Sequence, residues 1–512
     1  MNTKMKTMAS ALAISSLAFA GQAQSLDEKV NAGFAFATGW FVNLIFSPFP
    51  GTSFPWIVMW LVIAASVFTL YFGFVQFRNI RMSLSIVRGD YTDPNDAGEV
   101  SHFQALATAL SGTVGLGNIA GVAVAVTIGG AGATFWMILA GLLGMASKFV
   151  ECTLGVKYRN EYASGAVSGG PMYYITKGFA ERGLPLGKPL AILFAIFCIL
   201  GALGGGNMFQ SNQAHQAITG ITGDYPGWIT GIVFAVIVFS VIVGGIKSIA
   251  NVTEKIVPFM GVLYVGAALI ILLMNFSQIP AAFGAIFAGA FTGAGIAGGA
   301  VGALIQGFKR AAFSNEAGVG SAAIAHSAVK TNEPITEGLV SLLEPFIDTV
   351  VICTMTALVI IITGQLTTDP TTGLYILGEN GQIVTASGAT GVGLTAAAFG
   401  STISWFPFVL AIAVILFAFS TMISWSYYGL KAWTFLFGES KASELTFKVI
   451  FCIFVVIGAA ASLGPVIDFS DAAIFAMAVV NITALYFLMP IVKRELESFL
   501  SRVKSGEIKK FK

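Results

Sequence analysis

Two stretches of the sequence place glycines and small polar residues inside long apolar runs. Residues 111–121 read SGTVGLGNIAG, and residues 313–321 read FSNEAGVGS. A glycine costs a helix about 1 kcal/mol relative to alanine, and an unpaired amide in hydrocarbon costs more still. We therefore expect each stretch to have a function that offsets these costs.

The chemistry predicted for both stretches is ion binding by an unwound membrane helix. Unwinding exposes amide N–H groups that attract an anion and carbonyl groups that coordinate a cation, and it is tolerated at membrane depth only where the backbone lines a cavity. The alternative is that the glycines are notches for helix packing, because Gly117 and Gly121 fit the GxxxG spacing. Packing alone does not explain the polar residues at matching positions of both stretches: Thr113, Asn118, Ser314, Asn315 and Glu316.

The composition places these stretches in a membrane. Of the 512 residues, 56% are hydrophobic and only 10% are charged, and the mean hydropathy is +0.83; these values predict an all-α polytopic membrane protein. Eleven segments are long and apolar enough to span a bilayer. They are residues 55–77, 103–127, 133–154, 190–213, 226–245, 256–275, 299–326, 338–363, 406–428, 445–462 and 472–491.

The first residues predict a signal peptide at 1–24. Lys4 and Lys6 form a basic start, residues 8–20 form an apolar core, and residues 18–20 or 21–23 form a small-residue cleavage site. The mature N-terminus would then lie outside the cell. The alternative is an uncleaved amphipathic helix.

The charges predict the same orientation. Apart from the leader, Lys29 and the seventh span, every Lys and Arg lies in or beside a segment assigned to the cytoplasm. Because basic loops remain in the cytoplasm, we expect a multi-pass protein of a bacterial inner membrane with a cytoplasmic C-terminus. The charged residues of the predicted outer loops are all acidic: Asp224, Asp369, Glu379, Asp468 and Asp471.

The two glycine-rich stretches lie in the second and seventh spans, about 200 residues apart. With the first span set aside, the other ten form two groups of five in opposite orientation, and each group begins with a broken helix. This pattern predicts a secondary transporter with a midplane site. The predicted organisation is an extra N-terminal helix and cytoplasmic loop at 25–100, inverted repeats at 101–298 and 299–492, and a cytoplasmic basic tail at 493–512.

No redox or organic cofactor is predicted. The three histidines are not spaced as ligand pairs, which argues against a respiratory-chain subunit or another membrane enzyme, and no ring of like elements indicates a channel. The cysteines lie far apart without a CxxC spacing, as inert packing residues do. They are Cys152, Cys198, Cys353 and Cys452.

Four motifs resemble those of the alanine/glycine:cation symporters, the sodium:alanine symporter family. They are VGLGN at 114–118, GGPMYYI at 169–175, GGGNMFQSNQ at 204–213 and GFKRAAFSNEAGVG at 307–320. VGLGN is also similar to the first core helix of the neurotransmitter:sodium symporters. The resemblance runs from about residue 55 to 490. It implies a leucine-transporter-like 5+5 inverted repeat with one extra N-terminal helix, and sodium-driven uptake of alanine and glycine.

The same resemblance implies a role for each end of the substrate. The amides near Leu116 and Gly117 would hold the carboxylate, and Asn118 would orient it. The carbonyls around Phe313 and Ser314 would receive the ammonium group. This arrangement suits a zwitterion, because each end meets a helix dipole of opposite sign. The full predicted substrate set is Thr113, Leu116, Gly117, Asn118, Asn207, Gln210, Phe313, Ser314, Thr421 and Trp425.

The ninth span completes a sodium site by the same resemblance. The Ser420 and Thr421 hydroxyls would join the carbonyls of Ser111, Val114 and Phe417. Such an all-oxygen set without carboxylates suits a monovalent hard cation. Taken alone, two adjacent hydroxyls more often bond to their own helix backbone.

Three amides, Asn207, Gln210 and Gln213, recur on one face of the fourth span. We predict that Asn207 and Gln210 line the pocket and leave Gln213 out, although interhelical hydrogen bonding explains such amides equally well. Phe313 and Trp425 are expected to restrict the pocket to small side chains.

Lys309 and Arg310 lie inside the seventh span, where a central cation costs about 2.5–3.5 kcal/mol. We predict a structural or gating ion pair with Glu316, or with Glu344 and Asp348 of the eighth span. The rival interpretation is that these cations balance the substrate carboxylate.

The sequence thus predicts a monomeric sodium:alanine/glycine symporter that works in the lipid bilayer without a nucleic-acid partner. The first alternative is a transporter of the same fold that uses protons or another small amino acid. No His or carboxylate lies in the second-span stretch, which favours sodium, whereas Glu316 in the seventh leaves a proton open. A channel or an enzyme subunit is the remaining alternative.

Overall fold

The computed structural model describes residues 26–52, 54–93, 96–163, 165–292, 298–508 and 510, so the predicted leader lies outside the described residues. The helices in chain order are α2 (Leu26–Ile45), α3 (Trp56–Tyr71), α4 (Val75–Arg78), α5 (Ile80–Val87), α6 (His102–Thr113), η1 (Gly117–Gly121), α7 (Val122–Gly129), α8 (Gly132–Lys157), α9 (Pro171–Glu181), α10 (Gly187–Leu203), η2 (Gly204–Met208), α11 (Phe209–Thr222), α12 (Gly227–Ile242), α13 (Gly245–Met274), η3 (Phe276–Gln278), α14 (Ile279–Thr292), α15 (Gly299–Asn315), α16 (Ala322–His326), α17 (Pro334–Ser341), α18 (Leu343–Pro345), η4 (Phe346–Cys353), α19 (Thr354–Ile362), α20 (Gly391–Thr402), α21 (Phe406–Phe437), α22 (Lys441–Ala460) and α23 (Leu463–Ser505). Two short strands, β1 (Asn160–Glu161) and β2 (Val167–Ser168), pair antiparallel.

The helices form a bundle with apolar outer faces. Among the described residues, seven helices are long and apolar enough to cross a membrane, and a bent pair makes up an eighth span. Val236, Val262 and Ile453 are exposed on α12, α13 and α22, as side chains that face lipid are. Each predicted span overlaps helical backbone, and the number of eleven crossings stays a prediction.

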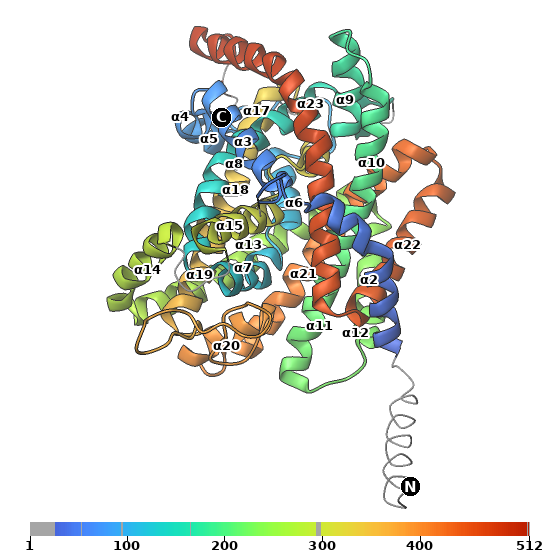
Figure 1. Cartoon of the computed structure of the whole chain (residues 1–512). Coiled ribbons are helices and arrows are strands. Elements are labelled where there is room, and N and C mark those ends of the chain that lie inside the picture. The colour runs from blue at the N-terminus through green and yellow to red at the C-terminus, as the bar shows by residue number, and fades with distance from the viewer. Residues whose placement is uncertain are drawn as a thin grey trace, which may run out of the picture.

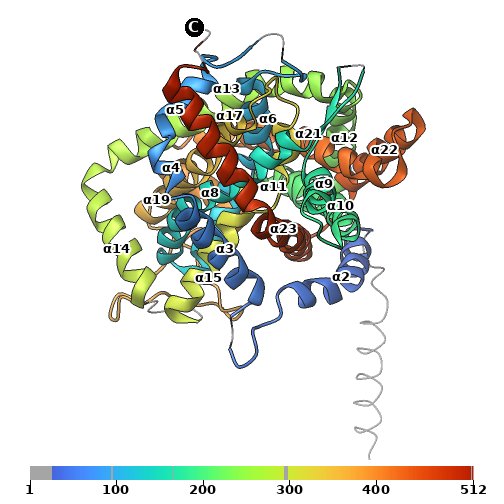
Figure 2. The same cartoon turned by 90° about the horizontal axis from the view of Figure 1, so that it is seen from above.

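The ends of the bundle differ in the elements that they carry. Helices α4, α5 and α9 and the C-terminus lie at one end, and α20 lies at the other (Figure 1). Seen from above, α11 lies inside the bundle, whereas α14 and α22 lie at opposite sides of its rim (Figure 2).

The second span is broken where the sequence predicts. Helix α6 starts behind a capping box formed by Ser101 and Gln104 and ends at Thr113. Val114 then leaves helical geometry, with φ −75° and ψ 86°. The chain continues as the π-helix η1 and then as α7, and the two halves of the span are bent by 48°.

The seventh span is broken at its predicted stretch as well. Helix α15 ends at Asn315, because Glu316 adopts a left-handed φ of 56°. Gly318 and Gly320 follow with φ of 80° and 91°, a conformation that glycine adopts without steric cost. The chain becomes helical again at α16, so both predicted interruptions are confirmed.

Several described helices lie outside the predicted spans, among them α2, α14 and α20. Helix α2 packs against α23, and α14 and α20 lie in segments predicted as loops. The prediction was also wrong for Asp468 and Asp471, which lie in α23 and not in an outer loop. Helix α23 begins at Leu463, ahead of the predicted span, and buries Asp471 in its early turns.

Candidate substrate and ion site

The first break is held open by the side chain of Asn118. Its Oδ1 accepts a hydrogen bond of 2.9 Å from the Gly115 N–H. Its Nδ2 donates to the Asp348 carbonyl at 3.0 Å and to Asp348 Oδ1 at 2.6 Å. Asn118 therefore ties the unwound segment to η4 of the eighth span, a contact that the sequence did not predict.

The next amide in the break faces the fourth span. The Leu116 N–H donates to Gln210 Oε1 at 3.2 Å, and Gln210 Nε2 donates to the Gly205 carbonyl of η2 at 2.8 Å. An amide that is predicted to hold a carboxylate thus already binds an oxygen acceptor. Gln210 therefore lies at the break.

A chain of buried oxygens joins the end of α6 to α21. Thr421 Oγ1 donates to the Ser111 carbonyl at 3.0 Å. Ser111 Oγ donates to the Ser420 carbonyl at 2.6 Å, and Ser420 Oγ donates to the Phe417 carbonyl at 3.0 Å. Four of the five predicted sodium ligands therefore lie together, and their hydroxyl and carbonyl oxygens are the donor set that suits sodium.

Ser424 belongs to the same cluster and was not predicted. Its single hydroxyl proton is shared between two acceptors, Ser111 Oγ and the Thr108 carbonyl, each 3.0 Å from Ser424 Oγ. The available signal was its position one helical turn beyond Ser420, on the same face of α21. Val114, the fifth predicted ligand, lies in the break, and its N–H donates to the Leu110 carbonyl.

Two aromatic side chains, Trp425 and Phe313, pack beside the second break. The Trp425 indole donates to Glu316 Oε1 at 2.9 Å and lies so close to η2 that a Cβ on Gly206 would be 2.2 Å from Cγ of the indole. Phe313 packs edge-on against Phe209, with centroids 5.2 Å apart.

The two breaks are also in contact with each other. A Cβ on Gly117 would lie 3.3 Å from Ser314 Cα. Two discontinuous helices that meet around unwound backbone and hydroxyl oxygens form the kind of site that secondary transporters place at the midplane.

Residues 40–512 match the sodium:alanine symporter family. The chain belongs to this family. It is 41% identical over 456 residues to the sodium/alanine symporter AgcS of Methanococcus maripaludis, and the alignment covers 89% of this chain and 96% of that protein. It is 33% identical over 454 residues to the probable sodium/glutamine symporter GlnT of Bacillus subtilis, with 87% and 89% covered.

The fold of this sodium:alanine symporter family member is also found among solved structures. The crystal structure of MhsT in complex with L-phenylalanine matches with a TM-score of 0.50 at 16% sequence identity, and the match covers 79% of this chain and 99% of that chain. The family member is therefore a multi-pass membrane transporter with a leucine-transporter-like fold, and it is not an enzyme.

The predicted partners of Lys309 and Arg310 were wrong. Both cations of this family member pair with Asp471: Lys309 Nζ lies 2.9 Å from Asp471 Oδ2, and Arg310 Nη2 donates to the same oxygen. This pair was not predicted, because Asp471 was assigned to an outer loop. Arg310 and Asp471 are buried, and Arg310 lies over the Phe313 ring at 5.2 Å.

The carboxylates predicted for that pair serve other groups. Glu316 accepts hydrogen bonds from Trp425 and Ser321, and Asp348 accepts from Asn118 and Thr349. Glu344 binds Lys148 and His326, in a group of buried charges that sequence reasoning missed.

Two predicted substrate residues direct their side chains elsewhere. Asn207 Nδ2 donates to the Phe451 carbonyl of α22 at 2.7 Å, which is the interhelical hydrogen bond left open as an alternative. Thr113 Oγ1 donates within its own helix, to the Ala109 carbonyl at 3.2 Å.

Proposed function

We propose that this transporter carries alanine or glycine into the cell together with sodium, by alternating access. The observation that carries the proposal is the Thr421–Ser111 contact, which places a cluster of hydroxyl and carbonyl oxygens beside the unwound amides of Leu116 and Gly117. A cation bound there and a carboxylate bound at the amides would share one helix break. Each would therefore favour the binding of the other.

The tight packing around the breaks supports a small substrate. Gly117 faces Ser314 at close range, and the Trp425 indole leaves no space above Gly206. Phe313 closes the side toward Phe209. The AgcS relative is named for alanine, whereas the GlnT relative is named for glutamine. We therefore assign alanine or glycine to this chain on the size of the side chains and the resemblance of the motifs.

One sodium ion is energetically sufficient. A membrane potential of about 100 mV supplies about 2.3 kcal/mol per charge, and a tenfold sodium gradient adds about 1.4 kcal/mol. Together they sustain an accumulation of a few hundredfold.

A proton-coupled transporter of the same fold is the second candidate, and one observation favours it. Asp348 lies at the first break through its contact with Asn118, so a titratable group is closer to the site than the sequence indicated. The relative YrbD of Bacillus subtilis carries the name putative sodium/proton-dependent alanine carrier.

Uptake into proteoliposomes decides between these candidates. We expect labelled alanine to accumulate when a sodium gradient is imposed, and not when a proton gradient of equal size replaces it. Thr421→Val should raise the sodium concentration for half-maximal uptake by at least about tenfold, because the ion loses one of its oxygen ligands, the Thr421 hydroxyl. The matched control is Thr434→Val on the same helix, whose hydroxyl bonds to the Lys431 carbonyl. Uptake that ignores sodium would refute the proposed coupling.

The proposed location is a bacterial inner membrane, with the mature N-terminus outside and the protein working as a monomer. The distribution of basic residues supports this orientation, because the C-terminus and the loops around α4, α5 and α9 share one end of the bundle (Figure 1).

A further inference from the structure

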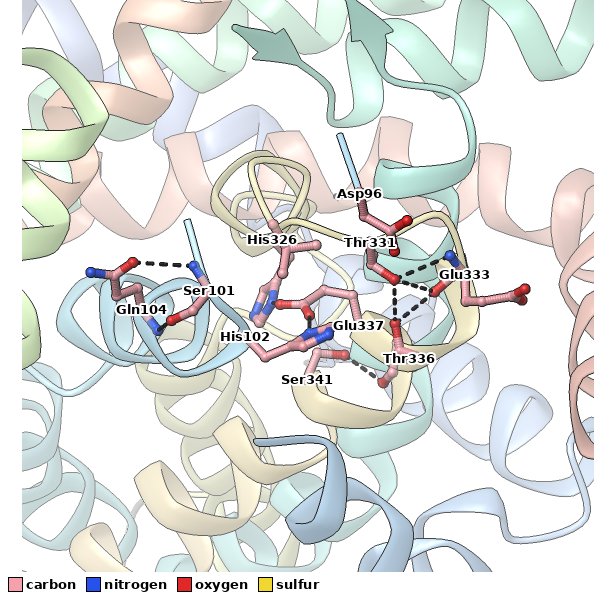
Figure 3. Close-up of polar contacts among 12 residues, drawn as sticks. Asp96, Ser101, His102, Gln104, His326, Thr331, Glu333, Thr336, Glu337 and Ser341 are labelled. Carbon is pink, nitrogen blue, oxygen red and sulfur yellow. Dashed lines mark hydrogen bonds and ion pairs between the residues drawn. The ribbon is translucent and has the colours of Figure 1, made fainter. Parts of the chain in front are cut away.

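Away from the two breaks, five buried ionisable side chains form one connected group. This histidine–glutamate cluster consists of His102 on α6, Lys148 on α8, His326 on α16, Glu337 on α17 and Glu344 on α18. His102 and His326 approach the same Glu337 carboxylate from opposite sides (Figure 3). The cluster joins α6, the half of the second span before its break, to α16, the half of the seventh span after its break.

The contacts in the cluster form a chain. Glu337 Oε2 meets His102 Nδ1, and Glu337 Oε1 lies 2.5 Å from His326 Nδ1. His326 Nε2 meets Glu344 Oε1, and Glu344 Oε2 accepts from Lys148 Nζ at 3.0 Å. Three imidazole–carboxylate contacts therefore occur among two histidines and two glutamates.

Counting hydrogens shows that this arrangement needs one extra proton. A neutral imidazole has one N–H donor, and an ionised carboxylate has none. Two neutral histidines supply two protons for three contacts, so the third contact would bring two acceptors together. His326 is the place for the extra proton, because both of its nitrogens face carboxylate oxygens. As an imidazolium it also balances Glu337, while Lys148 balances Glu344.

Among the described residues, three further carboxylates on the packed elements already accept hydrogen bonds from other side chains. Glu151 accepts from Asn481, Glu316 from Trp425, and Glu254 from Gln104. The titratable and charged side chains on the elements packed around the cluster include Arg81 of α5, Glu151 and Cys152 of α8, Tyr174 of α9, Glu254 of α13, Glu316 after α15, Arg159, Glu333, Tyr428 of α21 and Arg502 of α23.

A metal ion does not explain the group equally well. Cys152, His326 and Glu344 offer ligand atoms within 4.8 Å of one another. Glu344, however, is already bound by the Lys148 ammonium, which would repel a divalent cation beside it. A proton needs only the contacts that are present.

We propose that the histidine–glutamate cluster is a proton-binding site, and that loss of its proton releases α16 from α17 and α18. Without the proton, His326 can donate to Glu337 or to Glu344 but not to both. Because α16 is the continuation of the seventh span beyond its break, proton binding favours one arrangement of that half-helix. The proton stabilises the packing at low pH, and this stabilisation is lost as the pH rises. The site is separate from the sodium ligands and does not depend on the coupling ion.

Hydrogen exchange of the purified full-length protein, in buffer without sodium and alanine, tests this proposal. After correction for intrinsic chemistry, exchange of residues 322–331 in the wild type should rise by up to about tenfold per pH unit once the proton is lost, the limit for one proton. Exchange of α22 should not change.

Glu337→Gln provides the decisive variant. The glutamine amide can accept from His102 and donate to His326, so all three contacts are satisfied without the extra proton. Exchange at 322–331 should therefore become independent of pH. The matched control is Glu254→Gln, which replaces a carboxylate outside the cluster and should retain the wild-type response. A pH response that survives in Glu337→Gln would overturn the proposal.

A measurement on the wild type keeps the test valid if Glu337→Gln does not fold. The chain has three histidines, so nitrogen-15 labelling of histidine yields few signals, and His215→Gln assigns one of them. We expect one imidazole with both nitrogens protonated at about pH 7.5, above the usual histidine range. Neutral imidazoles throughout at this pH would refute the assignment of the proton to His326.

Discussion

At the scale of single residues, one small residue and one buried carboxylate hold neighbouring helices of the site region together. Gly117 allows the two breaks to touch, and Asp471 neutralises two cations on the same helix. Neither role is visible in a helix considered alone, because each needs a partner from another helix. Both can be tested by one substitution with a neighbouring control.

Gly117→Val should block substrate binding. A Cβ at this position already lies 3.3 Å from Ser314 Cα, so a branched side chain would force the breaks apart and cover the amides. We expect at least about a tenfold weaker alanine affinity, a change of about 1.4 kcal/mol, in a scintillation-proximity binding assay. Gly121→Ala is the control, because its Cβ would meet only the Leu116 carbonyl at 4.0 Å. Equal losses in both variants would mean that contact with Ser314 is not the cause.

Asp471→Asn should destabilise the protein strongly. Removing one partner of a buried ion pair costs about 3–5 kcal/mol, because the remaining charge stays buried, and here two cations would remain. Thermal unfolding in detergent measures the effect. The control is Asp468→Asn, one turn earlier and exposed, which should change the melting temperature little. A similar melting temperature for Asp471→Asn and wild type would contradict a structural pair and support the rival role as a counter-charge for substrate.

At the scale of elements, the breaks were predictable and several helices were not. Local composition predicts the interruptions at SGTVGLGN and FSNEAGVG, because glycine and polar residues rarely occur together inside apolar spans. Helix α2 was missed because its first turns are polar, and its place is set by packing on α23. The His102–Glu337 contact joins residues 235 positions apart, and no local pattern indicates it.

The close packing of the π-helix η2 against α21 can be tested by one substitution. Gly206→Ala would place a Cβ 2.2 Å from Cγ of the Trp425 indole, a rigid group that is itself held by Glu316. We expect overpacking to cost about 1–3 kcal/mol or more and to reduce uptake, measured as melting temperature and initial rate. Gly266→Ala on α13 is the control, since nothing lies within 4 Å of its Cβ. An unchanged Gly206→Ala variant would show that α21 can shift away from η2.

At the scale of the whole molecule, the bundle has two chemically distinct ends, and their sidedness follows from charge rather than from the fold. A leucine-transporter-like fold can in principle sit in a membrane either way. We predict that the basic residues around α5, α9 and the C-terminal part of α23 set the orientation, because Lys and Arg prefer the cytoplasm.

Cysteine labelling tests this orientation. In a variant without the four native cysteines, Thr372→Cys and Ser505→Cys place single thiols at exposed positions on the two ends. We expect a membrane-impermeant maleimide to label Thr372→Cys in intact cells, and Ser505→Cys only after permeabilisation. Labelling in the opposite pattern would reverse the predicted topology and leave the fold unchanged.

The hydrogen bond from Leu116 to Gln210 has a consequence for the direction of flux. Net uptake requires the carrier to return empty, whereas exchange of internal for external substrate does not. Under the proposed function, Gln210 is a placeholder that satisfies the Leu116 amide when no substrate carboxylate is bound there. In Gln210→Leu that donor would be left bare in the empty state, at a cost of about 1–3 kcal/mol. Net uptake measured in vesicles should then slow on the order of tenfold relative to exchange in the same preparation. Equal slowing of both would remove this role. The Gln210 side chain would thus be needed for the return of the empty carrier in net uptake, and not for exchange of substrate.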